Sequence, residues 1–134
     1  MREIKFRGYN KEREEWVYGC LCRHSNGESY IITYLSENVI SRESVVYLVD
    51  KESIGQFTGV LDNNGNEIYE GDILQYSVAK KRKIVVEWSE YAFIGREFTR
   101  KNEKYPIFIC SSRIEDFYLK VICNRYENKE LIKT

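Results

Sequence analysis

The residues best suited to chemistry in this sequence are basic and aromatic side chains interleaved between residues 80 and 104. The segment holds eight Lys or Arg and four Glu, whereas the whole chain of 134 residues balances 21 basic against 21 acidic residues. Cations pair with phosphates and rings stack on bases, so this mixture is typical of single-stranded nucleic-acid binding. The alternative is a solvated hairpin tip beside core aromatics. The candidate nucleic-acid-binding residues are Lys80, Lys81, Arg82, Lys83, Arg96, Arg100, Lys101, Tyr91 and Phe93.

Cysteine and histidine supply one pattern that resembles a metal site. Cys20, Cys22 and His24 alternate, so on a strand they share one face at intervals of about 7 Å. Zinc needs ligands that converge at about 2.0 to 2.3 Å, and no Gly or Pro lies between these residues to form a knuckle. We therefore expect reduced thiols here and at Cys110 and Cys123, and no metal site.

A calcium loop is suggested by oxygen-bearing residues at alternating positions, and it fails on two counts. Asp62, Asn64 and Asn66 match the first three ligand positions. Glu67 then stands where the loop needs glycine, and Ile73 stands where it needs a bidentate glutamate. A hairpin turn at Asn64-Gly65 explains the same residues without a metal.

The sequence offers no credible catalytic cluster. His24 is the only histidine, and its spacing from Cys22 matches no recognised signature of a dyad. Glu70-Gly71-Asp72 is more typical of a turn in which Asp72 bonds backbone amides than of paired catalytic carboxylates. The eight glycines are scattered and form no phosphate loop. We expect a protein that is not an enzyme and uses no cofactor.

Any site must be positioned mainly by β-strands. Ile and Val together number 24 against nine Leu and Ala, and strand-favouring residues make up 47 of the 134. Short alternating runs separated by Gly, Asn, Asp and Ser predict an all-β, mainly antiparallel fold. The expected strands are Ile4 to Tyr9, Trp16 to Cys22, Tyr30 to Tyr34, Val45 to Val49, Ile54 to Val60, Ile73 to Val78, Ile84 to Trp88, Ala92 to Ile94, Ile107 to Ile109 and Tyr118 to Cys123.

Other local signals complete the expected organisation. Pro106 suits the start of an edge strand, and Ser112 stands three residues before Glu115 in capping-box order, which predicts one helical turn. Residues 126–134 are expected to form a short helix or a tail. A charged stretch at Asp50 to Ser53 divides a single domain into possible lobes, 1–50 and 51–134.

No apolar run approaches the roughly 18 residues that a membrane span needs. The N-terminus, Met1-Arg2-Glu3-Ile4-Lys5, has no apolar core of a signal peptide. We therefore expect a cytoplasmic protein without a membrane partner.

The stretch IGQFTGVLDNNGNEIYEGDIL, residues 54–74, resembles the central signature of the YopX family, small proteins encoded largely by bacteriophages and prophages. Its flanks agree: Lys5-Phe6-Arg7 before Trp16, Val85 to Trp88, and Val121 to Asn128 resemble the family's opening, middle strand and closing motif. The resemblance covers nearly the whole chain.

The sequence departs from the family pattern at three places. Tyr9-Asn10 stands where Trp-Asp is frequent, Cys123 replaces a glycine, and Lys129 replaces a proline. The resemblance implies an all-β protein with an SH3-like barrel in its C-terminal two-thirds and an N-terminal β portion packed on it. It supplies no catalytic residue and no ligand.

Without a catalytic cluster, we expect an accessory protein that acts through contacts with phage or host proteins, with single-stranded nucleic acid as the alternative partner. Many rings and open strand edges in a small chain also predict self-association, most simply a two-fold dimer. The candidate surfaces are Tyr30, Tyr34 and Tyr47, and the edge strand after Pro106.

Overall fold

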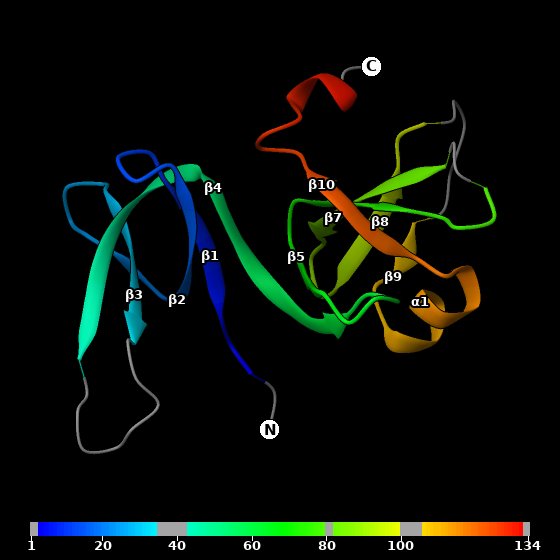
Figure 1. Cartoon of the computed structure of the whole chain (residues 1–134), viewed down its shortest axis with the longest axis horizontal. Coiled ribbons are helices and arrows are strands. Elements are labelled where there is room, and N and C mark those ends of the chain that lie inside the picture. Colours follow the sequence, from blue (N-terminus) through cyan, green and yellow to red (C-terminus); the bar gives the residue numbers. More distant parts are fainter. Residues whose placement is uncertain (1–2, 35–42, 80–81, 100–105, 133–134) are drawn as a thin grey trace. The chain divides into compact units, whose positions relative to one another are not determined.

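The computed structural model describes residues 3–34, 43–79, 82–99 and 106–132. They form an all-β protein in which the strands belong to two compact units, Met1–Gln56 and Phe57–Thr134 (Figure 1). The sequence placed its boundary a few residues earlier, near Asp50 to Ser53. The expectation of an all-β, antiparallel fold is confirmed.

The first unit contains β1 (Phe6–Asn10), β2 (Glu15–Arg23), β3 (Ser29–Tyr34) and the first part of β4 (Ser44–Leu61). Neighbours pair antiparallel in the order β1-β2-β3-β4, and β4 also pairs with β1. Alternate residues point inward, where Val17, Ile31 and Val49 form the core of the unit. A Cβ on Gly8 would lie 2.7 Å from the Val49 Cβ, so the chain needs glycine where β1 crosses this core.

Strand β4 replaces two strands that the sequence predicted, Val45 to Val49 and Ile54 to Val60. The prediction of a break is wrong because the polar stretch between them changes its pairing partner without leaving the strand. Up to Val49 the strand pairs with β3, and from Asp50 it pairs with β1. Ser53 Oγ holds this junction by accepting from Tyr9 N at 2.7 Å and donating to Asp50 O at 2.5 Å.

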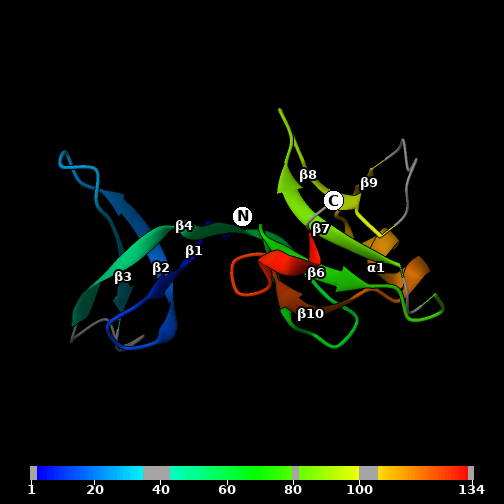
Figure 2. The same ribbon diagram turned by 90° about the horizontal axis from the view of Figure 1, so that it is seen from above.

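The second unit holds β5 (Glu67–Tyr69), β6 (Asp72–Gln75), β7 (Lys83–Trp88), β8 (Phe93–Glu97), β9 (Ile107–Phe108), α1 (Ser111–Phe117), β10 (Lys120–Asn124) and the 3₁₀ turn η1 (Lys129–Leu131). Five strands form one antiparallel sheet in the order β10-β6-β7-β8-β9 (Figure 2). Ile68, Leu74, Ile84, Val86 and Leu119 lie in its core. The predicted edge strand after Pro106 is confirmed, since β9 ends the sheet.

A single carboxylate organises the turn between β4 and β5. Asp62 is 6% exposed, and its Oδ1 accepts from Asn64 N at 2.9 Å and Asn66 N at 2.8 Å. Its Oδ2 accepts from Val121 N at 2.9 Å, which ties the turn to β10. Gly65 takes a φ of +83°, as the predicted turn at Asn64-Gly65 requires. The oxygen-rich stretch is thus a hydrogen-bonded turn.

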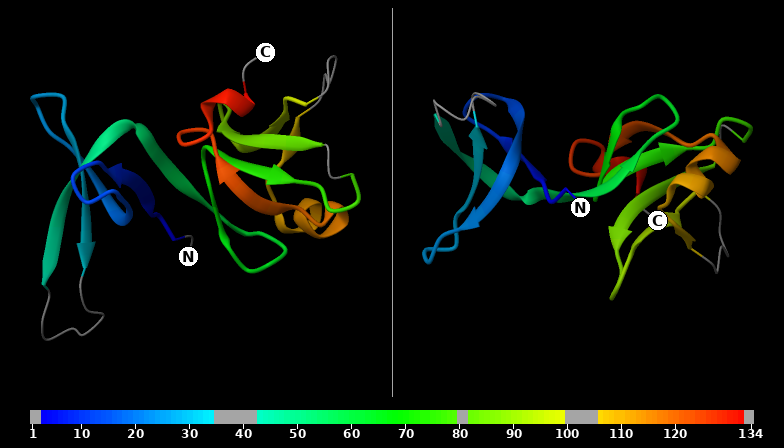
Figure 3. Two further views of the ribbon diagram at one scale, coloured as in Figure 1. Left: turned by 45° about the horizontal axis from the view of Figure 1, so that its top comes forward. Right: turned by 90° about the horizontal axis from the view of Figure 1, so that it is seen from below.

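The helical signals were only partly right. Helix α1 lies beside the strands of the second unit (Figure 3) and begins at Ser111, with Cys110 as its N-cap and no side-chain capping bond. Ser112 therefore lies inside the helix, and the capping-box prediction is wrong.

Asp72 does bond a backbone amide, as predicted, accepting from Tyr69 N at 2.8 Å. Among the described residues, no helix is long and apolar enough to cross a membrane.

Candidate interaction surface

Three strands of the first unit turn an uncharged set of side chains away from its core. One row across the sheet consists of Cys20 of β2, Ile32 of β3 and Val46 of β4, which lie opposite one another. The next row consists of Cys22, Tyr30 and Leu48 from the same three strands. We call this set the outer face. Its members are Tyr18, Cys20, Cys22, Tyr30, Ile32, Tyr34, Val46 and Leu48. Charged residues adjoin the set at its border, where Arg7 of β1 lies opposite Tyr18 and Asp50 follows Leu48 at the same spacing along β4.

The outer face is exposed as well as apolar. Tyr34 is 62% exposed, Val46 57% and Leu48 49%, and Tyr18 is 44% exposed. Although 31% of the residues in the chain are charged, none of these eight is. Contiguous exposed apolar surface on a small protein is typical of an interaction site.

Two of the three predicted interface tyrosines belong to this face. Tyr30 and Tyr34 do, because they alternate with the buried Ile31 along β3. Tyr47 does not, because it is paired with Ile31 and packs against the core of the unit. The alternation within Ser44 to Val49 already indicated this inward orientation, because Tyr47 and Val49 are two residues apart and therefore point to the same side of the strand.

The structure separates His24 from Cys20 and Cys22, because β2 ends at Arg23. Cys20 and Cys22 are exposed on the outer face, while His24 lies past the end of the strand, in the turn before β3. His24 instead lies edge-on to the Tyr30 ring at 6.4 Å between centroids. In the part of the chain that the structure describes, no three His, Cys, Asp or Glu side chains gather in a way that would hold a metal ion.

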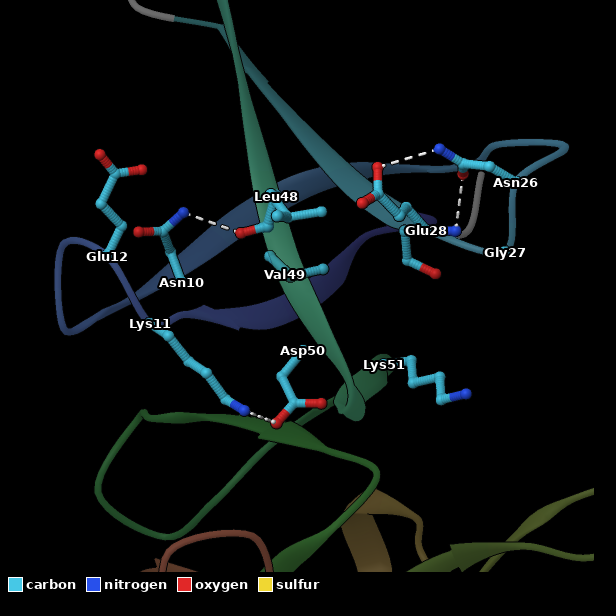
Figure 4. Close-up of a pocket in the computed structure, with 11 residues that line it drawn as sticks. Asn10, Lys11, Glu12, Asn26, Gly27, Glu28, Leu48, Val49, Asp50 and Lys51 are labelled. Atoms are coloured by element: carbon cyan, nitrogen blue, oxygen red, sulfur yellow. Dashed lines mark hydrogen bonds and ion pairs between the residues drawn. The ribbon is translucent and has the colours of Figure 1, made fainter.

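A cleft of about 480 Å³ lies next to the outer face, and no sequence signal pointed to it. Figure 4 shows most of its lining: Asn10 at the end of β1 with Lys11 and Glu12 of the following turn, and Asn26 to Glu28 of the β2–β3 turn, flank Leu48 to Lys51 of β4. Ser29, the first residue of β3, completes the lining. These three segments are distant in the chain, so no local motif could announce them. Leu48 belongs to both the cleft and the outer face.

Polar contacts shape the cleft on both sides of β4. Asn10, 5% exposed, donates from Nδ2 to the Leu48 carbonyl at 2.8 Å and accepts from Arg13 N at 2.7 Å. Lys11 Nζ lies 3.2 Å from Asp50 Oδ2. On the other side, Glu28 Oε2 accepts from Asn26 Nδ2 at 3.1 Å.

Two of the three basic candidates that the structure describes, Arg82 and Arg96, are engaged in ion pairs in the second unit. Arg82 Nη2 lies 2.7 Å from Glu97 Oε2, and the Arg82 guanidinium lies 4.7 Å from the centre of the Tyr76 ring. Arg96 contacts Glu87 through two bonds of 3.0 and 3.1 Å. These bonds raise the pKa of Arg96. Lys80, Lys81, Arg100 and Lys101 lie outside the described residues.

The two arginines face opposite sides of the sheet. Arg96 and Glu97 are consecutive in β8, so their side chains diverge, and each arginine lies with its own carboxylate. Arg96 is opposite Val85, whereas Glu97 is opposite the core residue Ile84. These two cations therefore do not form one basic surface.

The aromatic candidates also separate. Tyr91 is 77% exposed, whereas Phe93 is 8% exposed and belongs to the core. Trp88, half exposed, meets Phe93 edge-on at 4.9 Å between ring centroids. Tyr91 is the exposed ring of the predicted pair.

The comparisons with known proteins agree with the sequence resemblance. A family model described as YopX protein matches residues 5–133, nearly the whole chain. The chain belongs to the YopX family. A search of curated proteins found no match.

A solved structure shares the fold of this YopX family member. The crystal structure of protein EF1440 from Enterococcus faecalis superposes with a TM-score of 0.62, covering 99% of this chain and 100% of that chain. Sequence identity is 22%, so the likeness concerns the fold alone.

Proposed function

We propose that this chain is a non-enzymatic accessory protein, encoded by a phage or prophage, that acts in the cytoplasm through protein contacts. The observation that carries the proposal is the outer face, where eight neighbouring side chains from three strands include no charge. Contacts with a phage or host protein would use the same face. We also propose, from the family resemblance, that residues 51–134 form an SH3-like barrel.

The first occupant that we assign to the outer face is a second copy of the chain. An uncharged face meets its own copy across a two-fold axis without repulsion, and one self-complementary patch is sufficient for a dimer. Burying rings and aliphatic groups contributes roughly 25 cal/mol per Å² of apolar area removed from water. The proposed assembly is therefore a homo-oligomer in which Tyr34, Val46 and Leu48 form the contact between copies.

The cysteines of the outer face provide a direct test in the unmodified protein. Cys20 and Cys22 are exposed in the single chain, so a second copy would shield them from a maleimide reagent. We expect their labelling rate to fall as protein concentration rises from nanomolar to tens of micromolar. Cys110, in the second unit, is the internal control and keeps a constant rate. If the labelling rates of Cys20 and Cys22 do not change with protein concentration, self-association through this face is contradicted.

Nucleic-acid binding is the second candidate, supported by Tyr91, whose ring is 77% exposed. Lys83 also has no ion-pair partner within the described segments. Binding would fall steeply with salt, because each neutralised phosphate releases counterions. Nucleic-acid binding is rejected if the protein does not bind single-stranded DNA at low salt. It is also rejected if the Tyr91→Ala and Lys83→Ala variants bind single-stranded DNA as tightly as the wild type.

A further inference from the structure

Two turns of the chain share one backbone arrangement and one dipeptide. Residues 24–28 form the β2–β3 turn and residues 62–66 form the β4–β5 turn, each with Asn-Gly at its third and fourth positions. In each turn the first N–H donates to the last carbonyl, at 2.8 and 2.7 Å, and the glycine N–H donates to the first carbonyl at 3.0 Å. Gly27 and Gly65 take φ of +90° and +83°. The backbones around the two Asn-Gly pairs are therefore matched.

The side-chain amide of Asn26 is held at both of its polar atoms. Its Oδ1 accepts from Glu28 N at 2.9 Å, and its Nδ2 donates to Glu28 Oε2 at 3.1 Å (Figure 4). Glu28 Oε2 also accepts from the Tyr30 hydroxyl, which keeps the carboxylate in place. A reaction that expels the amide nitrogen of Asn26 must first give up its bond to Glu28.

The side-chain amide of Asn64 lacks this restraint. Asn64 is exposed, and its side chain has no hydrogen-bond partner among the residues that the structure describes. The last position of this turn is Asn66, whose backbone N–H and side chain both donate to the Asp62 carboxylate. The Asn64 amide is therefore free to turn toward the nitrogen of Gly65.

We propose that Asn64 is a site of spontaneous deamidation in the folded protein, whereas Asn26 is protected. The nitrogen of Gly65 attacks Cγ of Asn64 and forms a cyclic imide, and ammonia leaves with the proton of that nitrogen. Water then opens the ring at either carbonyl carbon, which gives aspartate or, with the backbone running through Cγ, isoaspartate. Glycine favours the attack because it has no Cβ to crowd the nitrogen.

Other influences on the reaction are similar in the two turns. A Cβ built on Gly27 or Gly65 would meet nothing within 4 Å, so neither glycine is crowded. Each turn also contains a carboxylate, Glu28 or Asp62, so negative charge slows the loss of the glycine N–H proton in both. The bond from Asn26 to Glu28 separates them. We expect Asn64 to react roughly tenfold faster or more, the effect of one hydrogen bond to a charged group.

The product alters the turn that Asp62 organises. Asp62 Oδ1 accepts from Asn64 N at 2.9 Å and from Asn66 N at 2.8 Å. Isoaspartate inserts a methylene group into the backbone between these two donors, so they no longer fit the same oxygen. Either product also adds a carboxylate near the buried carboxylate of Asp62, and like charges repel. Deamidation thus weakens the β4–β5 turn.

The test follows both asparagines in the same full-length protein. The protein is kept at mildly alkaline pH, and peptides from samples taken over time are analysed by mass spectrometry, with fragmentation that separates aspartate from isoaspartate. We expect Asn64 to be converted well before Asn26. In urea both turns are lost, so the two residues should react at similar rates. A native protein in which Asn64 reacts no faster than Asn26 would overturn the proposal.

Variants assign the difference to named groups. Glu28→Ala, at an exposed position, removes the carboxylate that holds the Asn26 amide. It is expected to speed the deamidation of Asn26 several-fold and to leave that of Asn64 unchanged. Asn64→Gln keeps an amide at its position and should abolish the main modification. An unchanged rate for Asn26 in Glu28→Ala would show that this hydrogen bond does not protect it.

The weakening of the turn is measured on the deamidated protein, which anion-exchange chromatography separates from the unmodified protein. Hydrogen exchange of the Asn66 N–H is expected to be faster after deamidation, because its bond to Asp62 is disturbed. The Glu28 N–H has the same position in the β2–β3 turn and is the internal control, with an unchanged rate. Equal exchange of the Asn66 N–H in both forms would contradict the predicted weakening of the turn.

Discussion

The Tyr30 hydroxyl donates a hydrogen bond to Glu28 Oε2 across 2.5 Å. Tyr30 belongs to the outer face and Glu28 lines the cleft. The bond thus joins the apolar surface to the polar cleft beside it. A partner that covers the Tyr30 ring would lie next to the Glu28 carboxylate.

Removing this hydroxyl should change the titration of Glu28. The Tyr30 bond is the main cause that lowers the pKa of Glu28, followed by the bond from Asn26. Tyr30→Phe is therefore expected to raise the pKa of Glu28 toward the ordinary value of about 4.3. An NMR titration of the Glu28 carboxyl carbon measures it. Tyr34→Phe, on the same strand face, serves as the control, and an unchanged pKa in Tyr30→Phe would contradict the bond.

Two buried serines of the first unit should respond differently to alanine. Both are 5% exposed, but Ser53 Oγ makes two hydrogen bonds and Ser29 Oγ makes none to the described residues. Ser53→Ala is expected to lower the free energy of unfolding by about 1–3 kcal/mol, whereas Ser29→Ala changes it by less than about 0.5 kcal/mol. Urea unfolding compares them. A large loss in Ser29→Ala would show that the hydroxyl has a structural role.

Asp62 should stabilise the second unit in a pH-dependent way. Burial raises the pKa of Asp62, but the backbone N–H groups of Val121, Asn66 and Asn64 together lower it more. Asp62→Asn replaces one acceptor oxygen with a donor, so we expect a loss of about 1–3 kcal/mol in the free energy of unfolding at pH 7.

The sign of the pH effect follows from the lowered pKa of Asp62. The stabilisation is fully present above the unfolded pKa of Asp, about 3.9, and is lost as the pH falls through the lower folded pKa. Wild type and Asp62→Asn should therefore converge in acid. Asp116→Asn, at an exposed position, is the control. A difference between wild type and Asp62→Asn that persists unchanged in acid would contradict this account.

Arg82 and Lys83 are neighbours with different expected roles. Arg82 pairs with Glu97, whose side chain is 5% exposed, and covers the Tyr76 ring. Arg82→Ala should cost about 2 kcal/mol or more, because it leaves a buried carboxylate without this guanidinium. Lys83→Ala should change the free energy of unfolding by less than about 0.5 kcal/mol. Similar small effects for both in thermal and urea unfolding would show that the Arg82 pair is not structural.

The sequence predicted the strand-rich fold and most turns because these depend on local alternation and on Gly, Asn and Asp. It missed the continuity of β4, since the pairing change at Val49–Asp50 depends on β1, about forty residues away. It also missed β5, whose three residues are too few for alternation to be read.

Site prediction from the sequence met the same limit. Charge density singled out residues 80–104, but the sequence did not reveal that Arg82 and Arg96 lie with carboxylates on opposite sides of a sheet. The sequence analysis identified only part of the outer face, because it selected Tyr30 and Tyr34 as aromatic residues and not by the side of the strand that they occupy. Parity along β3 and β4 would have excluded Tyr47 and added Val46 and Leu48.

The central claim is that the outer face binds a second copy, and Val46→Lys tests it most directly. Light scattering of the eluting protein, at micromolar concentration and again at high salt, should give a mass at least twice 16.0 kDa for the wild type. Val46→Lys should give a 16.0 kDa species, because it places a charge in the apolar contact. Val78→Lys, the same change at a position that is 88% exposed in the second unit, should retain the wild-type mass. A 16.0 kDa wild type at every concentration, or an oligomer that survives Val46→Lys, would contradict the assignment of a second copy to the outer face.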